Sequence, residues 1–262
     1  MKRIIKFLFI ITFISYIVFP IITNLILSLS NLWQWPDILP SHITFVHYQK
    51  VFNQRNFWKS ILNTLHIALM VMLFNYILAM PSAYALSRLN SKYKPILMTL
   101  IILPIIVPPI LVLLNLYNHF LIWHLTDRKI GVIIAHMIPS LPYMFIMLYL
   151  GFEKIDKNYE SVYLSLGIRP INGFFKIILP QMKEAIILGG IMTFLISISQ
   201  YLSTLLIGGG SVLTLTLLLT PYISGGNTRV GAAQGILLII ICVLFIRLYE
   251  FVLLGGKNAR NS

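Results

Sequence analysis

Charged residues are scarce in this chain. Only 10% of its 262 residues are Asp, Glu, Lys or Arg, whereas a soluble domain usually carries about 25%. Hydrophobic residues make up 58% of the sequence. Most of the chain must therefore face lipid or be buried between membrane spans, and we expect a bilayer as its surroundings.

Acidic residues are the scarcest charged class. The seven of them are Asp37, Asp127, Glu153, Asp156, Glu160, Glu184 and Glu250, and none falls in the middle of an apolar run. A secondary transporter driven by protons or sodium usually needs acidic or His relays inside the membrane. The distribution argues against proton coupling, and an ion-coupled secondary transporter is kept as the alternative function.

Residues for catalysis or metal binding are also missing from the sequence. The single cysteine, Cys242, rules out an intrachain disulfide and any Cys-based metal or redox site. The sequence contains no HExxH zinc motif, no GxSxG elbow and no paired carboxylates at mid-membrane depth. We expect no cofactor and no enzymatic activity. Without a nucleotide-binding segment, the chain is not a self-sufficient pump.

Apolar runs long enough to cross a bilayer dominate what is present. A spanning helix needs roughly 20 apolar residues, and six segments meet this requirement. They are residues 4–29, 61–86, 96–117, 130–151, 184–207 and 230–254. The predicted fold is all-α, with six transmembrane helices in one permease-like domain over residues 1–262.

The third predicted span contains three prolines, Pro104, Pro108 and Pro109. Proline bends a helix, because it lacks the backbone N–H and clashes with the preceding turn. We favour a kink in a continuous helix. The alternative is a broken helix that lines a cavity.

Basic residues predict the orientation in the membrane. The net charge of +13 does not indicate nucleic acid, because the basic residues lie between apolar runs and are not grouped with aromatics. With the N-terminus inside, inside segments hold 13 of the 20 basic residues, including Lys257 and Arg260, and outside loops hold six. Inside loops of membrane proteins are enriched in Lys and Arg. Both termini are therefore predicted to be cytoplasmic.

The loop over residues 153–183 differs from the spans around it. Tyr159, Val162, Tyr163 and Leu166 recur at helical steps on one face. Gly167 is predicted to end this helix in a left-handed conformation, which glycine adopts without a Cβ clash.

A second short helix is predicted after the glycine. Pro170 can begin it, because the first N–H of a helix is unpaired in any case, and Pro180 is expected to end it. The loop is then two short helices with exposed apolar side chains, which need a partner. An interfacial helix resting on lipid headgroups is the alternative.

Five residues in this loop follow a recognisable spacing: Glu160, Gly167, Ile177, Leu179 and Pro180. The segment resembles the EAA loop of the inner-membrane permeases of binding-protein-dependent ABC importers. The two alanines that follow the glutamate in that family are here Ser161 and Val162, which leaves the docking geometry open.

This resemblance implies a type I importer fold, with the loop acting as a coupling helix. The implied partners are a cytosolic ABC ATPase dimer, a second permease subunit and an extracytoplasmic solute-binding protein. The implied coupling residues are Glu160, Ser161, Val162, Leu166, Gly167, Ile177, Leu179 and Pro180. Residues 201–210 and Thr214-Leu215 resemble the polyamine, iron(III), thiamine and phosphonate branch, so the solute is expected among these.

Polar residues inside the spans are the candidates for a solute pathway. We select Asn115, His136 and Gln200. An intramembrane histidine more often makes an interhelical hydrogen bond than a solute contact, and the sequence does not separate these roles.

Overall fold

Helices make up almost all of the described structure. The computed structural model describes residues 2–31, 33, 37, 39–40 and 42–255, and over these residues it contains no strand, only one isolated pairing of Ser30 with Ile43. The all-α prediction is confirmed. Lys257 and Arg260, which contributed to the predicted orientation, lie outside the described residues.

The chain forms two compact units, Met1–Ile61 with Thr214–Val243, and Leu62–Leu213 with Leu244–Ser262. The first unit holds α1 (Lys2–Leu29), α2 (Val46–Phe52), α12 (Leu215–Ser224) and most of α13 (Thr228–Leu254). The second unit holds most of α3 (Phe57–Arg88), then α4 (Lys94–Ile106), α5 (Pro109–Ile122), α6 (Lys129–Glu153), α7 (Asn158–Ser165), α8 (Pro170–Gly173), the π-helix η1 (Phe174–Ile178), α9 (Leu179–Gln181), α10 (Lys183–Ser199) and α11 (Tyr201–Gly208). One functional domain over the whole chain stays a prediction.

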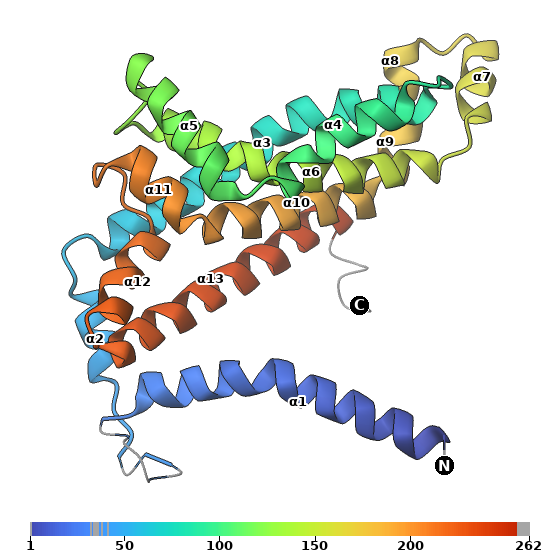
Figure 1. Ribbon diagram of the computed structural model, residues 1–262. Helices are drawn as coiled ribbons and strands as arrows, with labels where there is room; N and C mark the ends of the chain where they lie inside the picture. Colours follow the sequence, from blue (N-terminus) through green and yellow to red (C-terminus); the bar gives the residue numbers. More distant parts are fainter. Residues whose placement is uncertain (1, 32, 34–36, 38, 41, 256–262) are drawn as a thin grey trace. The chain divides into compact units, whose positions relative to one another are not determined.

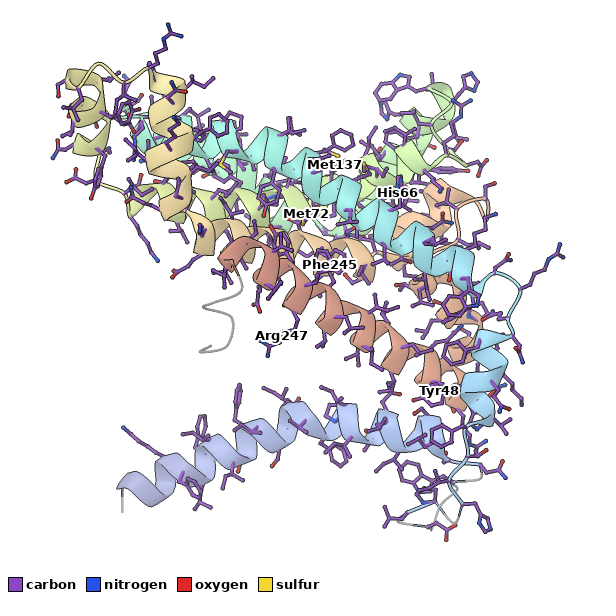
Figure 2. The ribbon with its side chains drawn as sticks, turned by 180° about the vertical axis from the view of Figure 1, so that it is seen from behind. Tyr48, His66, Met72, Met137, Phe245 and Arg247 are labelled. Atoms are coloured by element: carbon purple, nitrogen blue, oxygen red, sulfur yellow. The ribbon has the colours of Figure 1, made fainter. Side chains whose placement is uncertain are left out.

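The helices long and apolar enough to cross a membrane match the predicted spans in number. Four of the described helices, α1, α3, α6 and α13, meet this test. The number reaches six when two bent pairs each count as one span, namely α4 with α5, and Pro170–Gln181 with α10. Apolar side chains surround α1 on all sides (Figure 2). A helix that is apolar all round needs lipid or another chain as its neighbour.

The third span is broken, so the favoured interpretation of a kink is wrong. α4 and α5 meet at 92° across Val107 and Pro108. Each proline disfavours helical geometry in the residue before it, and Val107 and Pro108 are both extended, with ψ of 131° and 123°. Two consecutive prolines therefore hold two residues outside the helix.

The fifth span is shorter than predicted. The helix expected over residues 184–207 stops at Ser199, and α11 begins at Tyr201. Gln200 lies between them with a ψ of 75°, which is not helical. α10 has 17 residues, or about 26 Å of helix at 1.5 Å per residue.

α6 is the central helix of the second unit and packs against α10, α11, α4 and α5 (Figure 1). Small residues allow α6 and α10 to approach closely. A side chain on Gly151 would overlap Ala185, and one on Gly189 would overlap Met144. Close approach of this kind is typical of helix pairs in membranes.

Candidate functional site

The segment from Asn158 to Gln181, here called the coupling element, turns sharply between α7 and α8 (Figure 1). Gly167 has a φ of +74°, as predicted for the residue that ends the first helix. Its N–H donates to the carbonyl of Leu164 at 2.9 Å, and the N–H of Ile168 donates to Tyr163 at 3.0 Å. These two bonds form a Schellman motif, which satisfies the last carbonyls of α7.

The second half of the coupling element is a short helix with a widened turn. Pro170 occupies its first turn, as predicted. The predicted end at Pro180 is wrong, because the helical backbone continues through η1 and α9 to Gln181. A proline ring clashes with the carbonyl four residues earlier in a regular α-helix. The π turn over Phe174–Ile178 contains Lys176, the residue four before Pro180, and loosens that spacing.

The predicted apolar face of α7 is divided in two. Tyr163 is buried, and its ring covers Gly173 so closely that a side chain there would overlap it. Several large apolar side chains stay exposed, here called the exposed apolar set: Tyr159, Val162, Leu164, Leu166, Ile171 and Phe175. Leu166 is 72% exposed. Tyr163 thus stabilises the element, while the exposed apolar set stays largely uncovered, with Phe175 in edge contact with the ring of Phe174.

Glu160 is held by an arginine that sequence reasoning missed. Arg88, the last residue of α3, donates from Nε to Oε1 of Glu160 at 2.6 Å and from a terminal nitrogen to the carbonyl of Phe152 at 3.1 Å. The Arg88 guanidinium also lies over the ring of Tyr84. The two charged side chains are only 14% and 24% exposed. Arg88 therefore joins the ends of α3 and α6 to the beginning of α7.

A second ion pair lies nearby. Nζ of Lys94 donates to Oε1 of Glu153 at 3.1 Å, and these side chains are 24% and 38% exposed. It joins the start of α4 to the end of α6, just before the coupling element begins.

The predicted coupling residues occupy different environments. Ser161 Oγ donates to the carbonyl of Asn158, and Pro180 is exposed. Ile177 and Leu179 are half-buried, and Ile177 packs on the core. Five of the eight predicted residues are exposed: Ser161, Val162, Leu166, Gly167 and Pro180.

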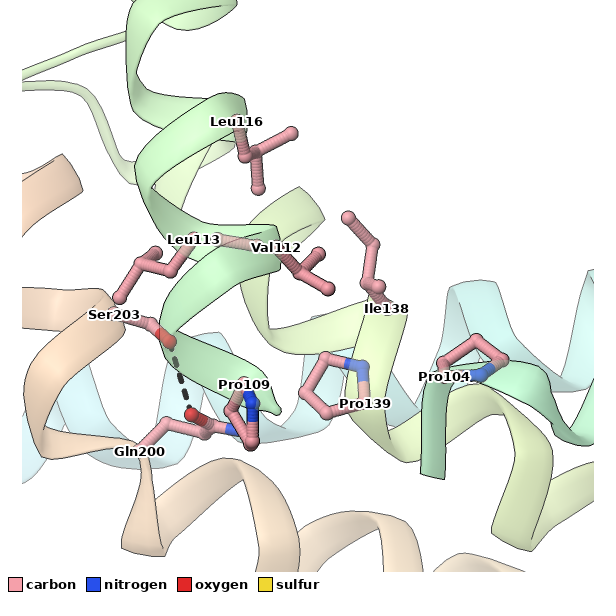
Figure 3. Close-up of a pocket in the computed structure, with 10 residues that line it drawn as sticks. Pro104, Pro109, Val112, Leu113, Leu116, Ile138, Pro139, Gln200 and Ser203 are labelled. Atoms are coloured by element: carbon pink, nitrogen blue, oxygen red, sulfur yellow. Dashed lines mark hydrogen bonds between the residues drawn. The ribbon is translucent and has the colours of Figure 1, made fainter. Parts of the chain in front are cut away.

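A pocket lies between the α4–α5 break and the α10–α11 break (Figure 3). Its volume is about 30 Å³, close to that of one water molecule. Its ten lining residues come from α4, α5, α6 and the α10–α11 break: Pro104, Pro109, Val112, Leu113, Leu116, Ala135, Ile138, Pro139, Gln200 and Ser203. None of them is ionisable. Ser203 Oγ donates to Oε1 of Gln200 at 2.9 Å, so the two polar residues of the pocket contact each other.

Gln200 is the one predicted pathway residue that lines this pocket. Asn115 is exposed and donates to the carbonyl of Leu111 in its own helix. His136 lies outside the pocket lining, is 1% exposed and hydrogen-bonds Ser197 and Thr204. Ser203 was missed, although its spacing of three residues from Gln200 in an apolar helix was a signal.

No group of three or more His, Cys, Asp or Glu side chains in the described residues could hold a metal ion. The arrangement offers an apolar docking surface on one element and a small uncharged pocket at another.

A family model described as "Binding-protein-dependent transport system inner membrane component" matches residues 75–253. The chain is similar to the sulfoquinovosyl glycerol transport system permease protein SmoH of Agrobacterium fabrum, with 26% identity over 63% of this chain. The match spans 58% of the length of SmoH. It is also similar to the spermidine/putrescine transport system permease protein PotB of Haemophilus influenzae, with 25% identity over 84% of this chain and 81% of PotB.

The fold resembles a solved transporter subunit. A bacterial alginate ABC transporter, crystallised in complex with alginate pentasaccharide-bound periplasmic protein, has a chain that matches with a TM-score of 0.75. The match is 15% identical and covers 98% of this chain and 96% of that chain. At this identity the likeness shows the fold alone.

Proposed function

The chain belongs to the family of binding-protein-dependent transport system inner membrane components, the multi-pass permeases of ABC importers, and from this premise we propose how it is driven. A cytosolic ABC ATPase dimer docks on the coupling element and transmits nucleotide-driven movement to the spans. The chain forms half of the solute pathway, and a second permease subunit, identical or homologous, forms the other half.

The exposed apolar set carries this proposal. Val162 and Leu166 are 54% and 72% exposed, although the element that bears them is held rigidly by the Schellman turn at Gly167 and the Arg88–Glu160 pair. Exposed apolar side chains on a fixed backbone are typical of a protein docking surface. A rigid element can also pass a displacement on to α3 and α6, where it is attached.

The pocket between the two helix breaks supports a solute pathway that runs past this point of the chain. Discontinuous helices in transporters place irregular backbone where it lines a cavity. Here the α4–α5 break brings Pro109 to the pocket, and the α10–α11 break brings Gln200 and Ser203. The volume of about 30 Å³ holds about one water molecule, so passage of a solute would require the ATPase cycle to widen this region.

The remaining partners follow from the family. An extracytoplasmic solute-binding protein would deliver the solute to the outer side. The excess of basic residues in alternate loops supports a membrane orientation with both termini in the cytoplasm. In that orientation the coupling element faces the cytoplasm, where an ATPase is available.

The solute is proposed from the relatives. PotB, which is named for spermidine and putrescine, aligns with 84% of this chain. We therefore place polyamines first, ahead of iron(III), thiamine and phosphonate. Because no ionisable side chain lines the pocket, selection among these solutes would rest on the binding protein.

Uptake by reconstituted vesicles tests this proposal. The chain is purified in complex with its ATPase and its second permease subunit and is supplied with its binding protein, and uptake of radiolabelled spermidine is measured with ATP or with an imposed proton or sodium gradient. The proposal expects uptake with ATP and none with a gradient alone. Uptake that needs a gradient and is abolished by an ionophore would favour the secondary transporter instead.

A further inference from the structure

His136 bridges the two sides of the α10–α11 break. Its Nδ1 lies 3.0 Å from Oγ of Ser197, near the end of α10, and its Nε2 lies 3.0 Å from Oγ1 of Thr204, in α11. His136 itself is on α6 and is 1% exposed. One imidazole from a third helix therefore contacts both halves of a broken span.

The hydrogen-bond network assigns the tautomer of this histidine. The Thr204 hydroxyl donates its single hydrogen to the carbonyl of Gln200 at 2.7 Å, so it can only accept from His136. Nε2 of His136 must then carry a proton, and Nδ1 of the neutral ring accepts from the Ser197 hydroxyl.

The same network holds the residue at the break. The Gln200 carbonyl, at the start of α11, accepts from the Thr204 hydroxyl, and Oε1 of Gln200 accepts from the Ser203 hydroxyl. The backbone of His136 is fixed in turn, because Ser140 Oγ donates to its carbonyl and Asn75 donates to Ser140. The histidine is thus anchored through α6 to α3.

We propose that His136 is a positioning residue, which holds the α10–α11 break in the geometry that presents Gln200 and Ser203 to the pocket. The proposal rests on the proposed function where it concerns solute, but the geometry of the pocket can be tested without transport. Removing the imidazole frees both halves of the break, and the two polar side chains lose their fixed position.

Thiol labelling of the pocket tests this role in the isolated full-length permease. Cys242 is replaced by serine, and Val112→Cys places a reporter in the pocket lining, outside the hydrogen-bond network. We expect H136L to raise the labelling rate of the reporter cysteine, because the freed halves of the break expose the pocket more often. The increase should be about tenfold, which matches the stabilisation lost with one or two hydrogen bonds. H136Q, which keeps a donor and an acceptor, should restore part of the original rate.

His66 provides the matched control. His66 also lies within a predicted span, on α3 (Figure 2), but its side chain is exposed. H66L should therefore leave the labelling rate unchanged. If H136L does not fold, the smaller changes Ser197→Ala and Thr204→Val each remove one contact and should shift the rate in the same direction. Equal labelling of the parent, H136L and these two variants would overturn the proposal.

Uptake then separates this inference from the proposed function. In the complex with its ATPase, H136L should lower solute uptake per ATP hydrolysed while ATPase binding is retained. A parent complex that shows no ATP-driven uptake would count against the proposed function, and the labelling result would still decide the role of His136. Unchanged uptake per ATP in H136L would contradict the positioning role.

Discussion

At the scale of single residues, the features that shape the coupling element differ in whether the sequence predicts them. The left-handed Gly167 and the helix start at Pro170 follow from local backbone rules, and both predictions are confirmed. The pairing of Arg88 with Glu160 joins residues 72 positions apart. No local rule predicts such a contact, because it depends on how α3, α6 and α7 pack.

Gly167→Ala tests the turn. No atom lies within 4 Å of the added Cβ, so the change costs only the strain of a left-handed alanine, roughly 1–2 kcal/mol. We expect weaker ATPase co-purification and slower ATP-driven uptake, and Gly167→Asn should be tolerated better. Gly210, with a φ of +80° and equally open surroundings, is the matched control. Gly210→Ala should leave co-purification unchanged, and equal losses in both variants would contradict a special role for Gly167.

A double-mutant cycle tests the Arg88–Glu160 pair. With Arg88→Gln and Glu160→Gln, thermal unfolding of the permease in detergent should give a coupling energy of about 1–3 kcal/mol, since the pair is short and partly buried. The same cycle on Lys94 and Glu153, which are more exposed, should give roughly 0.2–1 kcal/mol. A coupling energy for Arg88–Glu160 no larger than that of the control pair would contradict its role as an anchor.

At the scale of elements, helix existence was predictable and helix continuity was not. Six apolar runs indicated the spans, because hydropathy and length alone determine what can cross a bilayer. Whether Pro108 and Pro109 bend or break a helix depends on neighbours that satisfy the freed backbone groups. The break at Gln200 has no proline to indicate it. Ser203 and Thr204 bind Gln200 locally, and the contact that joins the two sides comes from His136 on α6, which depends on tertiary packing.

Removing the two prolines tests the α4–α5 break. Pro108→Ala with Pro109→Ala relieves the restraint on Val107 and Pro108, so the 92° bend should relax toward a continuous helix. We expect ATPase co-purification to persist and solute uptake to fall at least tenfold, because the pocket loses one of its walls. Pro81→Ala, a proline inside the continuous helix α3, should leave uptake near normal. Full uptake in the double variant would contradict a role for the break in the pathway.

At the scale of the whole molecule, single-cysteine labelling tests the proposed orientation. In a Cys242→Ser background, Ser165→Cys on the coupling element and Asn227→Cys before α13 both lie at exposed positions. A membrane-impermeant maleimide should label Asn227→Cys in intact cells and Ser165→Cys only after the membrane is opened. The reverse pattern would place the coupling element outside the cell and exclude ATPase docking there.

The most direct test of the central claim is photo-crosslinking from the coupling element. A benzophenone amino acid replaces Leu166, which is 72% exposed, or Ile122 at the end of α5, which is 73% exposed, and the permease is co-expressed with its ATPase. We predict a crosslink to the ATPase subunit from position 166 and none from position 122. Failure to crosslink from 166 in a complex that still hydrolyses ATP and imports solute would contradict docking on the coupling element.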